Sequence, residues 1–547
     1  MSRIADHLIL APAALPLLAG AVMLLVDERR RALKAGINVA CTFALIGLAI
    51  ALLLMSDAIA PDGMPSQFGV YRLGSWPAPF GIVLVADRLS TLMLLLTSIL
   101  AAAAVVFSLA RWHRAGAHFH SLFQFLLAGL NGAFLTGDLF NLFVFFELLL
   151  AASYGLVLHG SGPARVKAGL HYIAVNLVAS LLFLIGVSLI YGIAGTLNMA
   201  DLAARIPATP SGDRRLVEAG AAVLGIAFLL KAGIWPMGFW LPTTYSAATP
   251  PVAAVFAIMT KVGAYVVLRL WLLLFGEGAG ASAQFGGEWL VSGGLMTIAF
   301  GAIGMLASQD MSRLAAFAVL VSSGTVFAAI GMGQAGLTAG ALYYMIGSML
   351  GTAAFFLLVE LVERGREPGA DVLAVTREVY GDGEDDIAGE DDVGVTIPAT
   401  MAVLGIGFIA CASMVAGLPP LSGFIAKFAL LSAALNPPGV TAGGGAIPAA
   451  AWALLVALVL SGLAALIAMA RAGIRAFWAP VDRAVPQVRV IEMAPVAALL
   501  VLCAIQAAYA GPIMQYMQAT AQSLHIPWAY VHEVMEPPHA TRRTSGT

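Results

Sequence analysis

The chain has 547 residues, of which 60% are hydrophobic and only 11% are charged, and its mean hydropathy is +0.92. A composition this apolar excludes a soluble globular protein. The net charge of −2 gives no basis for nucleic-acid binding, so the sequence predicts an integral membrane protein.

The apolar runs predict an all-α fold of about fourteen transmembrane helices, because lipid cannot satisfy the open edge of a sheet. A spanning helix needs about 20 apolar residues. The basic stretch DERRRALK follows the first run instead of preceding it, which indicates a membrane helix and not a signal peptide. The predicted spans are 8–26, 35–55, 82–110, 119–136, 138–159, 168–192, 218–240, 250–275, 289–307, 313–333, 338–362, 396–434, 449–472 and 490–516.

Arginine and lysine concentrate in alternate loops, which follow spans one, three, five, nine, eleven and thirteen. The main exceptions are Arg205, Arg214 and Arg215 after the sixth span. Basic loops face the cytoplasm, so we expect both termini outside it. Lys34 and Lys167 are expected in these loops.

A hydrophilic insert at 363–395 contains GDGEDDIAGEDD. It is too acidic and too rich in glycine to bury a core, so it predicts a mobile cytoplasmic loop. Both a solvated linker and a docking segment for a partner are consistent with this composition.

Two spans are interrupted at similar motifs. KAGIWPMGFWLP contains Gly233 and Pro236, and AGLPPLSGFIAKF contains Gly417, Pro419 and Pro420. Broken helices at corresponding places in two halves indicate a transporter with inverted repeats, although two ordinary proline kinks remain an alternative. The predicted divisions are an N-terminal segment 1–115, repeats 116–276 and 277–475, and a C-terminal helix and tail 476–547.

Five of the 28 basic residues are lysines, and three of them, Lys231, Lys261 and Lys427, lie inside apolar spans. Glu147 lies in the middle of the run FNLFVFFELLLAASYG. Each such charge costs about 2.5–3.5 kcal/mol at the centre of a spanning helix. Lysine can release its proton when buried, whereas arginine stays charged, so these four residues are candidates for a proton path.

A purely structural role is the alternative for each candidate, and for three of them a local contact would explain it. Glu147 would bond to a neighbouring helix, and Lys231 and Lys427 would satisfy carbonyls freed at the helix breaks. Lys261 has no such local explanation. Arg269 lies nearer the end of the eighth span, where we expect it to snorkel to the interface.

Three stretches resemble one family: GDLFNLFVFFELLLAASYGLVLHG, LLKAGIWPMGFWLPTTYSAATPPVAAVFAIMTKVGAYVVLRL and GLPPLSGFIAKF. They are similar to the D subunit of the multisubunit (Mrp-type) monovalent cation/proton antiporters of bacteria, which is related to the antiporter-like subunits of respiratory complex I. The resemblance implies a fourteen-helix subunit of a hetero-oligomeric complex in the bacterial inner membrane, with protons, Na⁺ or K⁺, and lipid as its other partners. The acidic insert suggests the branch associated with K⁺.

The resemblance also implies residue roles. Glu147 and Lys231 are expected to form an ion pair, and Lys261 and Lys427 to continue a hydrated axis across the mid-membrane. Many relatives carry a His and a Lys in the span matching YYMIGSMLGTAAFF, where this sequence has Gly347 and Gly351. The link between Lys261 and Lys427 is therefore either a water chain or absent.

The expected function is proton translocation within a Na⁺ or K⁺/proton antiporter. The alternatives are a proton-pumping membrane subunit of a complex I-like or hydrogenase complex, and a structural subunit without an ion path. The sequence shows no nucleophile–base pair and no metal-ligand pattern, so we expect no enzyme activity and no metal. The three cysteines, Cys41, Cys411 and Cys503, lie singly in apolar runs, so no cofactor is expected either.

Overall fold

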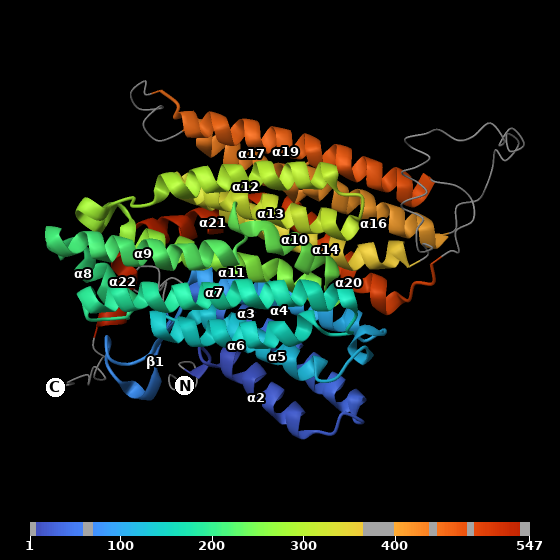
Figure 1. The fold of residues 1–547 in the computed structure, drawn as a ribbon, viewed down its shortest axis with the longest axis horizontal. Helices are drawn as coiled ribbons and strands as arrows, with labels where there is room; N and C mark the ends of the chain where they lie inside the picture. Colours follow the sequence, from blue (N-terminus) through green and yellow to red (C-terminus); the bar gives the residue numbers. More distant parts are fainter. Residues whose placement is uncertain (1–6, 58–68, 365–398, 437–445, 479–485, 537–547) are drawn as a thin grey trace, which may run out of the picture.

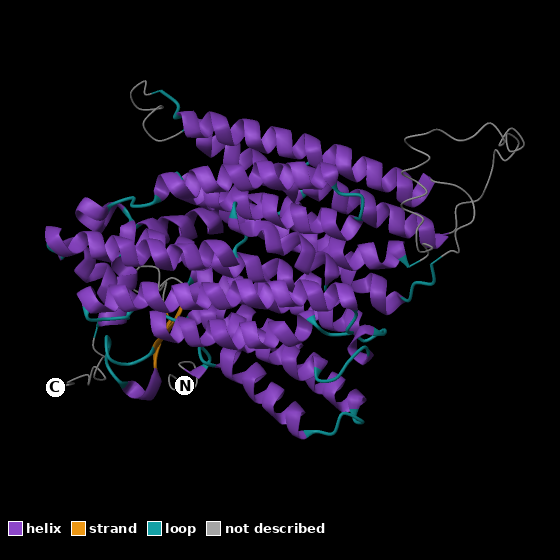
Figure 2. Ribbon diagram, in the orientation of Figure 1, coloured by secondary structure: helices purple, strands orange, loops and turns teal. Residues whose placement is uncertain are grey.

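The computed structural model describes residues 7–57, 69–364, 399–436, 446–478 and 486–536. Its helices lie side by side with their axes nearly parallel, and one short strand pair lies at an end of the bundle (Figures 1 and 2). The acidic insert predicted at 363–395 falls almost entirely outside the described residues.

The N-terminal part of the chain contains two membrane helices, a hairpin and a third helix. The first repeat predicted from the sequence follows. The helices and strands of these two parts are α2 (Ala11–Leu25), α3 (Arg31–Asp57), β1 (Gly69–Arg72), β2 (Val83–Ala86), α4 (Arg88–Ser108), α5 (Phe119–Leu135), α6 (Leu139–Val157), α7 (Pro163–Ala194), α8 (Met199–Arg205), α9 (Ser211–Lys231), α10 (Trp240–Ala247) and α11 (Pro250–Phe275).

Every regular element described in the rest of the chain is a helix. Its helices are α12 (Gly287–Ala307), α13 (Met311–Gly331), α14 (Ala335–Glu363), α16 (Ala399–Ala416), α17 (Ser422–Leu435), α19 (Ala449–Gly473), α20 (Val490–Ala508), α21 (Ala510–His525) and α22 (Trp528–Met535). The last predicted span, 490–516, is therefore one helix that ends at Ala508 and part of a second.

Among the described residues, 11 helices are long and apolar enough to cross a membrane, and α2, α5 and α17 are shorter apolar helices. This confirms an all-α membrane protein with about fourteen spans. The predicted seventh span, 218–240, covers most of α9 and the break after it and ends where α10 begins, and the predicted twelfth span is the pair α16 and α17. Helix α9 is absent from the eleven because Asp213, Arg214, Arg215 and Glu218 occupy its first turns.

The prediction of a helix from residue 82 is wrong at its start. Residues 83–86 form β2, which pairs antiparallel with β1 in the register Gly69↔Ala86 to Arg72↔Val83. Asp87 ends the strand and caps α4, because its carboxylate accepts from Ser90 N at 2.8 Å while Ser90 Oγ accepts from Asp87 N at 2.8 Å. Such a reciprocal capping box fixes where a helix begins.

Asp87 has a second partner that corrects another expectation. Arg269 on α11 is 7% exposed and does not snorkel. Its Nη1 lies 2.5 Å from Asp87 Oδ2, and its Nη2 donates to Asp87 Oδ1 at 2.8 Å. Tyr265 and Tyr530 place their rings 5.6 and 5.3 Å from the guanidinium. The arginine is buried because a carboxylate and two aromatic faces replace the water it gives up.

The placement of Lys34 and Lys167 in loops is also wrong. Lys34 lies in the first turn of α3, is 2% exposed and contacts the Glu28 carboxylate. Lys167 lies in the first turn of α7 and is exposed. In both cases the helix begins earlier than the apolar run, because basic residues can extend a spanning helix into the interface.

One end of the bundle carries both ends of the described chain. Arg72 Nη2 donates to the carbonyls of Glu533, Val534 and Glu536, and His7 Nδ1 lies 3.1 Å from the Tyr71 hydroxyl. Figure 1 shows β1, α8 and α22 at this end. The hairpin therefore joins residues near both termini.

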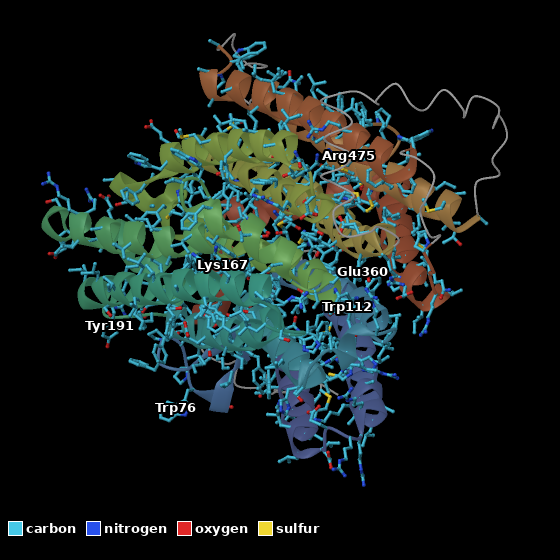
Figure 3. The ribbon with its side chains drawn as sticks, turned by 45° about the vertical axis from the view of Figure 1, so that its right-hand side comes forward. Trp76, Trp112, Lys167, Tyr191, Glu360 and Arg475 are labelled. Atoms are coloured by element: carbon cyan, nitrogen blue, oxygen red, sulfur yellow. The ribbon has the colours of Figure 1, made fainter. Side chains whose placement is uncertain are left out.

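The opposite end carries an arginine–glutamate network. Arg364 Nη2 lies 2.7 Å from both Glu360 Oε2 and Glu492 Oε1, and Arg111 also contacts Glu360. In Figure 3, Trp112, Glu360 and Arg475 lie at the end of the molecule opposite Trp76 and Tyr191. Two of the basic side chains predicted to face the cytoplasm, Arg111 and Arg364, therefore link the ends of α4, α14 and α20.

We predict that Arg269→Met destabilises the protein by about 3–5 kcal/mol, because it leaves the buried Asp87 carboxylate uncompensated. The additional change Asp87→Asn, which keeps the helix cap, restores part of this loss. Thermal unfolding of the detergent-solubilised protein measures both.

The matched control is Asp57→Asn. It breaks the contact with Arg88, in which the Asp57 side chain is 50% exposed. The Arg88 side chain is 11% exposed, but the Asp57 carboxylate is open to water. A solvent-exposed pair contributes about 0–1 kcal/mol, so only a small loss is expected. Equal losses in Arg269→Met and Asp57→Asn would contradict a stabilising role for the buried pair.

Candidate functional site: buried lysines at two helix breaks

The first helix break follows Lys231 directly. Gly233 has φ 75°, and a Cβ on Gly238 would lie 2.1 Å from the Gly233 carbonyl oxygen, so both positions require glycine. The groups freed by the break find partners: Trp240 Nε1 donates to Leu230 O at 3.2 Å, and Trp235 N donates to Thr297 Oγ1 at 2.8 Å. Helix α9 ends at Lys231 and α10 begins at Trp240, so Pro236 lies within the interruption.

The second break has the same construction. Gly417 has φ 78°, and the amides of Gly417 and Leu418 both donate to Ser413 O at 2.9 Å. A Cβ on Gly423 would lie 2.5 Å from Met414 O. Helix α16 ends before Pro419 and Pro420, and α17 begins after them. The shared geometry supports equivalent roles, and the division into two inverted repeats stays a prediction.

Lys231 is 6% exposed at the end of α9, and its Nζ lies 4.8 Å from the centre of the Phe146 ring. Glu147 follows Phe146 on α6 and is half-buried. Within the described residues, neither Lys231 Nζ nor Glu147 Oε1 has a hydrogen-bond partner. The expected direct ion pair is therefore not made: the two charges lie in the same region, but lysine contacts an aromatic face.

Lys261 lies at the middle of α11 and is 1% exposed. Its Nζ donates to Ser323 Oγ on α13 at 3.1 Å. A serine hydroxyl can accept this bond and still donate its own proton. The ammonium is thus held by a neutral group that can also pass a proton onward.

Lys427 lies on α17 just after the second break, with its Nζ donating to Ala416 O at 2.8 Å. Ala416 is the last residue of α16, so the contact is the one expected if Lys427 satisfied a carbonyl freed at the break. A Cβ on Gly417 would lie 2.9 Å from this Nζ, which shows that glycine gives the lysine its space. Structural capping and proton exchange are compatible, because the amine can hold and release a proton at the same place.

Sequence reasoning missed several hydroxyl-bearing residues near these lysines. Ser322 Oγ donates to Ser348 Oγ at 2.8 Å, linking α13 to α14. The Tyr344 hydroxyl lies beside Ser322 and Thr325. In the sequence, the only signal for them was the pair of serines in VSSG within an otherwise apolar span. This signal is weak, because serine is common where helices pack and carries no charge.

Within the part of the chain that the structure describes, no group of three or more His, Cys, Asp or Glu side chains is arranged so that it could hold a metal ion. The buried polar groups instead form a series: Glu147 and Lys231 near the first break, Lys261 with its serine partner, and Lys427 at the second break. Interrupted helices with ionisable side chains inside a helical bundle define an ion- or proton-translocating membrane subunit.

Residues 136–441 match the family described as NADH:quinone oxidoreductase/Mrp antiporter, transmembrane, and the chain belongs to this family. It is 62% identical over 535 residues to the D subunit of a probable K(+)/H(+) antiporter of Rhizobium meliloti, covering 98% of each protein. It is 33% identical to the D subunit of a Na(+)/H(+) antiporter of Alkalihalophilus pseudofirmus, covering 97% of this chain and all of that relative. Among solved structures it is similar to a chain of the Mrp complex from Dietzia sp. DQ12-45-1b, with a TM-score of 0.80, 25% identity, and coverage of 97% of this chain and 100% of that chain.

We predict that Ser323→Ala slows ion-driven proton movement in membrane vesicles at least about fivefold. The change removes the acceptor of the Lys261 hydrogen bond, and a buried unsatisfied donor costs about 1–3 kcal/mol. Ser323→Thr keeps the hydroxyl and retains most of the rate.

The control for this prediction is Ser98→Ala. Ser98 is also buried, but its hydroxyl bonds to Leu94 O within its own helix. A similar slowing in Ser98→Ala and Ser323→Ala would show that loss of any buried hydroxyl is enough and that the Lys261 contact has no special role.

Proposed function

We propose that this chain is the proton-carrying D subunit of a multisubunit monovalent cation/proton antiporter, with K⁺ as the favoured cation. The observation that supports it most strongly is the presence of three lysines inside the bundle, at or between two helix breaks of the same construction. The relative named as part of a K⁺/proton antiporter is 62% identical, against 33% for the relative named as part of a Na⁺/proton antiporter. This difference favours K⁺.

In the proposed mechanism, protons move along Glu147, Lys231, Lys261 and Lys427. A proton that reaches this region can reside on the Glu147 carboxylate or on the neutral Lys231 amine. Lysine passes it on because a buried amine exchanges protons, whereas Arg269, fixed in its ion pair, does not. Cation movement elsewhere in the complex would change the distance between Glu147 and Lys231 and so alter which of them holds the proton. Such coupling requires that both sites bias the same two states.

The aromatic contact at Lys231 suits this role. The Phe146 ring stabilises the ammonium without accepting its proton, and Glu147 is the next residue on the same helix. A movement of α6 that turns Glu147 toward Lys231 would therefore exchange a ring contact for a carboxylate contact. We propose that the structure represents the separated state and that closure of this gap is the step coupled to cation movement.

We also propose a location and a topology. The chain would lie in the bacterial inner membrane with both termini outside the cytoplasm. The end of the bundle that carries Arg111, Arg364, Arg471 and Arg475 would then face the cytoplasm, in agreement with the positive-inside rule. We propose a purely transporting role, without enzyme activity.

We predict that Lys231→Met, Lys261→Met and Lys427→Met each reduce cation-driven proton movement at least about tenfold in vesicles that contain the complete complex. Methionine keeps the length and apolar stem of the side chain but cannot carry a proton. Fluorescence of a pH-sensitive dye on addition of K⁺ or Na⁺ measures the effect at matched expression.

The matched control is Lys167→Met, which makes the same substitution at an exposed lysine. It should retain full activity. Wild-type proton movement in the variants of Lys231, Lys261 and Lys427 would overturn the proposed function and favour a structural subunit.

We further predict that the purified chain alone in vesicles shows no K⁺- or Na⁺-driven proton movement, whereas the complete complex does, with a larger response to K⁺. Among the described residues no group of three or more His, Cys, Asp or Glu side chains could hold a metal ion, and the lysines would repel a monovalent cation. Robust exchange by the single chain would contradict this division of labour, and copurification with flavin or iron–sulfur subunits would favour a redox-driven complex instead.

A further inference from the structure

An apolar groove of about 520 Å³ opens on the side of the bundle between α9 and α12, with α11 as its floor. On α11, Val267, Leu270 and Leu274 are buried beneath it, whereas Ile226 on α9 and Met296 on α12 are 41% and 48% exposed at its rims. Among the described residues, no charged side chain lines the groove. Its walls therefore suit a hydrocarbon chain, and its open side faces the surroundings of the bundle.

Two arginines precede the groove on α9. Arg214 and Arg215 lie in the early turns of this helix, and Ala221 is the first residue of α9 that lines the groove. An α-helix has 3.6 residues per turn, so residues seven or eleven positions apart lie on nearly the same face. Arg214 is therefore in line with Ala221 and Gly225, and Arg215 is in line with Ala222. Both arginines start from the groove side of α9.

The structure leaves the guanidinium groups of these arginines largely free. Arg215 is exposed and makes no hydrogen bond or ion pair to any described residue. Arg214 donates to one backbone carbonyl at 3.5 Å. Glu218 shares this face of α9, but its Oε1 accepts from a serine hydroxyl at 2.8 Å. Glu288 is exposed across the groove at the start of α12, where it would repel an anion, so an anionic group would be held on the α9 side.

The groove and the arginines together span the depth of one membrane leaflet. Trp271 and Trp289 line the end of the groove nearer the arginines, and tryptophan is typical of the level where lipid headgroups meet the acyl chains. At 1.5 Å per residue, α9 rises about 21 Å from Arg215 to Leu229. Half the thickness of a bilayer with its headgroups is about 20–22 Å. The arginines therefore lie at the headgroup level when the far end of the groove lies near the midplane.

The position of these arginines also lacks another explanation. Helix α8 leads through residues 206–210 into α9, so α9 starts at the end of the bundle that carries α8 and α22 (Figure 1). Our proposed topology places this end outside the cytoplasm, where the positive-inside rule gives arginine no role. Basic side chains beside a membrane surface attract anionic lipids, and such an attraction accounts for Arg214 and Arg215.

We propose that the groove binds an acyl chain of an anionic phospholipid, with the lipid phosphate held by Arg214 and Arg215. The tail would end against Trp235 and Pro236, which line the groove at the first helix break. Guanidinium groups bind phosphate through charge-assisted hydrogen bonds. An apolar helix of a partner subunit would fill the groove but leave both arginines without a counter-charge, so the lipid is the better occupant. This inference goes beyond the proposed function and holds whether or not Lys231 carries protons.

The experiment uses the complete complex in phosphatidylcholine vesicles. A small fraction of the lipid is either phosphatidylglycerol or phosphatidylcholine with the same photoactivatable acyl chain. Mass spectrometry measures labelling of 221–229 and 289–296, divided by labelling of 177–185 on α7, whose exposed side chains offer a surface outside the groove. The divided value should be at least about fivefold higher for phosphatidylglycerol, because charged hydrogen bonds to its phosphate are lost nowhere else in the comparison.

Two variants test the two parts of the site. Arg214→Gln combined with Arg215→Gln should remove the preference for phosphatidylglycerol, and Arg29→Gln with Arg30→Gln, at exposed arginines outside the groove, should keep it. Gly225→Leu should lower groove labelling at least about fivefold, because Gly225 lines the groove and a Cβ there would meet nothing within 4 Å.

Gly47→Leu is the matched control for the groove variant. It adds the same side chain to α3 at a glycine whose Cβ would also meet nothing within 4 Å, and it should leave groove labelling unchanged. A high-resolution map of the wild-type complex should show density for a phosphate beside Arg214 or Arg215 that continues as a tail into the groove. This map decides the matter if the variants do not assemble.

Three results would overturn the proposal. Equal labelling of the groove by the two lipids would show that the arginines select no headgroup. A groove that neither lipid labels, or that holds a partner helix in the map, would show that protein covers it. Unchanged labelling in Gly225→Leu would place the bound lipid elsewhere. Each of these results leaves the effects of the lysine variants on proton movement, and so the proposed function, untouched.

Discussion

An ionised side chain inside an apolar helical bundle needs a partner that compensates its charge. The structure depends on which partner each of these charges has. Asp87 and Arg269 meet this demand completely, with two short contacts, a helix cap and two aromatic rings. Such a pair is fixed, because separating it would expose both charges to the interior. The ion pair joins the start of α4 to α11, the helix that also carries Lys261.

The lysines meet the same demand only in part. Lys231 has an aromatic face, Lys261 has one serine hydroxyl and Lys427 has one backbone carbonyl. Each partner is neutral, so none of them holds the ammonium as firmly as Asp87 holds Arg269. The arginine has a full set of partners and each lysine has one, and this contrast is the physical basis for the proposal that the lysines carry protons.

Glycine shapes the surroundings of the lysines. At the two breaks it allows positive φ and close backbone approach, which bring Lys231 and Lys427 to freed helix ends. On α14 it does something different: Gly347 and Gly351 leave space beside a buried amide oxygen and several hydroxyls.

The sequence by itself determined the membrane class, the number of spans, the two helix breaks and the identity of the buried lysines. These follow from composition, from the length of apolar runs and from local backbone demands, all of which act within a short stretch of chain. Only the tertiary structure decided which groups meet: Arg269 with Asp87 across 182 residues, Lys261 with Ser323, and Gln506 with the glycine face of α14. It also turned the expected Glu147–Lys231 ion pair into an aromatic contact and the start of the third span into a strand. Pairing depends on which faces of distant helices pack together, and no local pattern in this sequence encodes that choice.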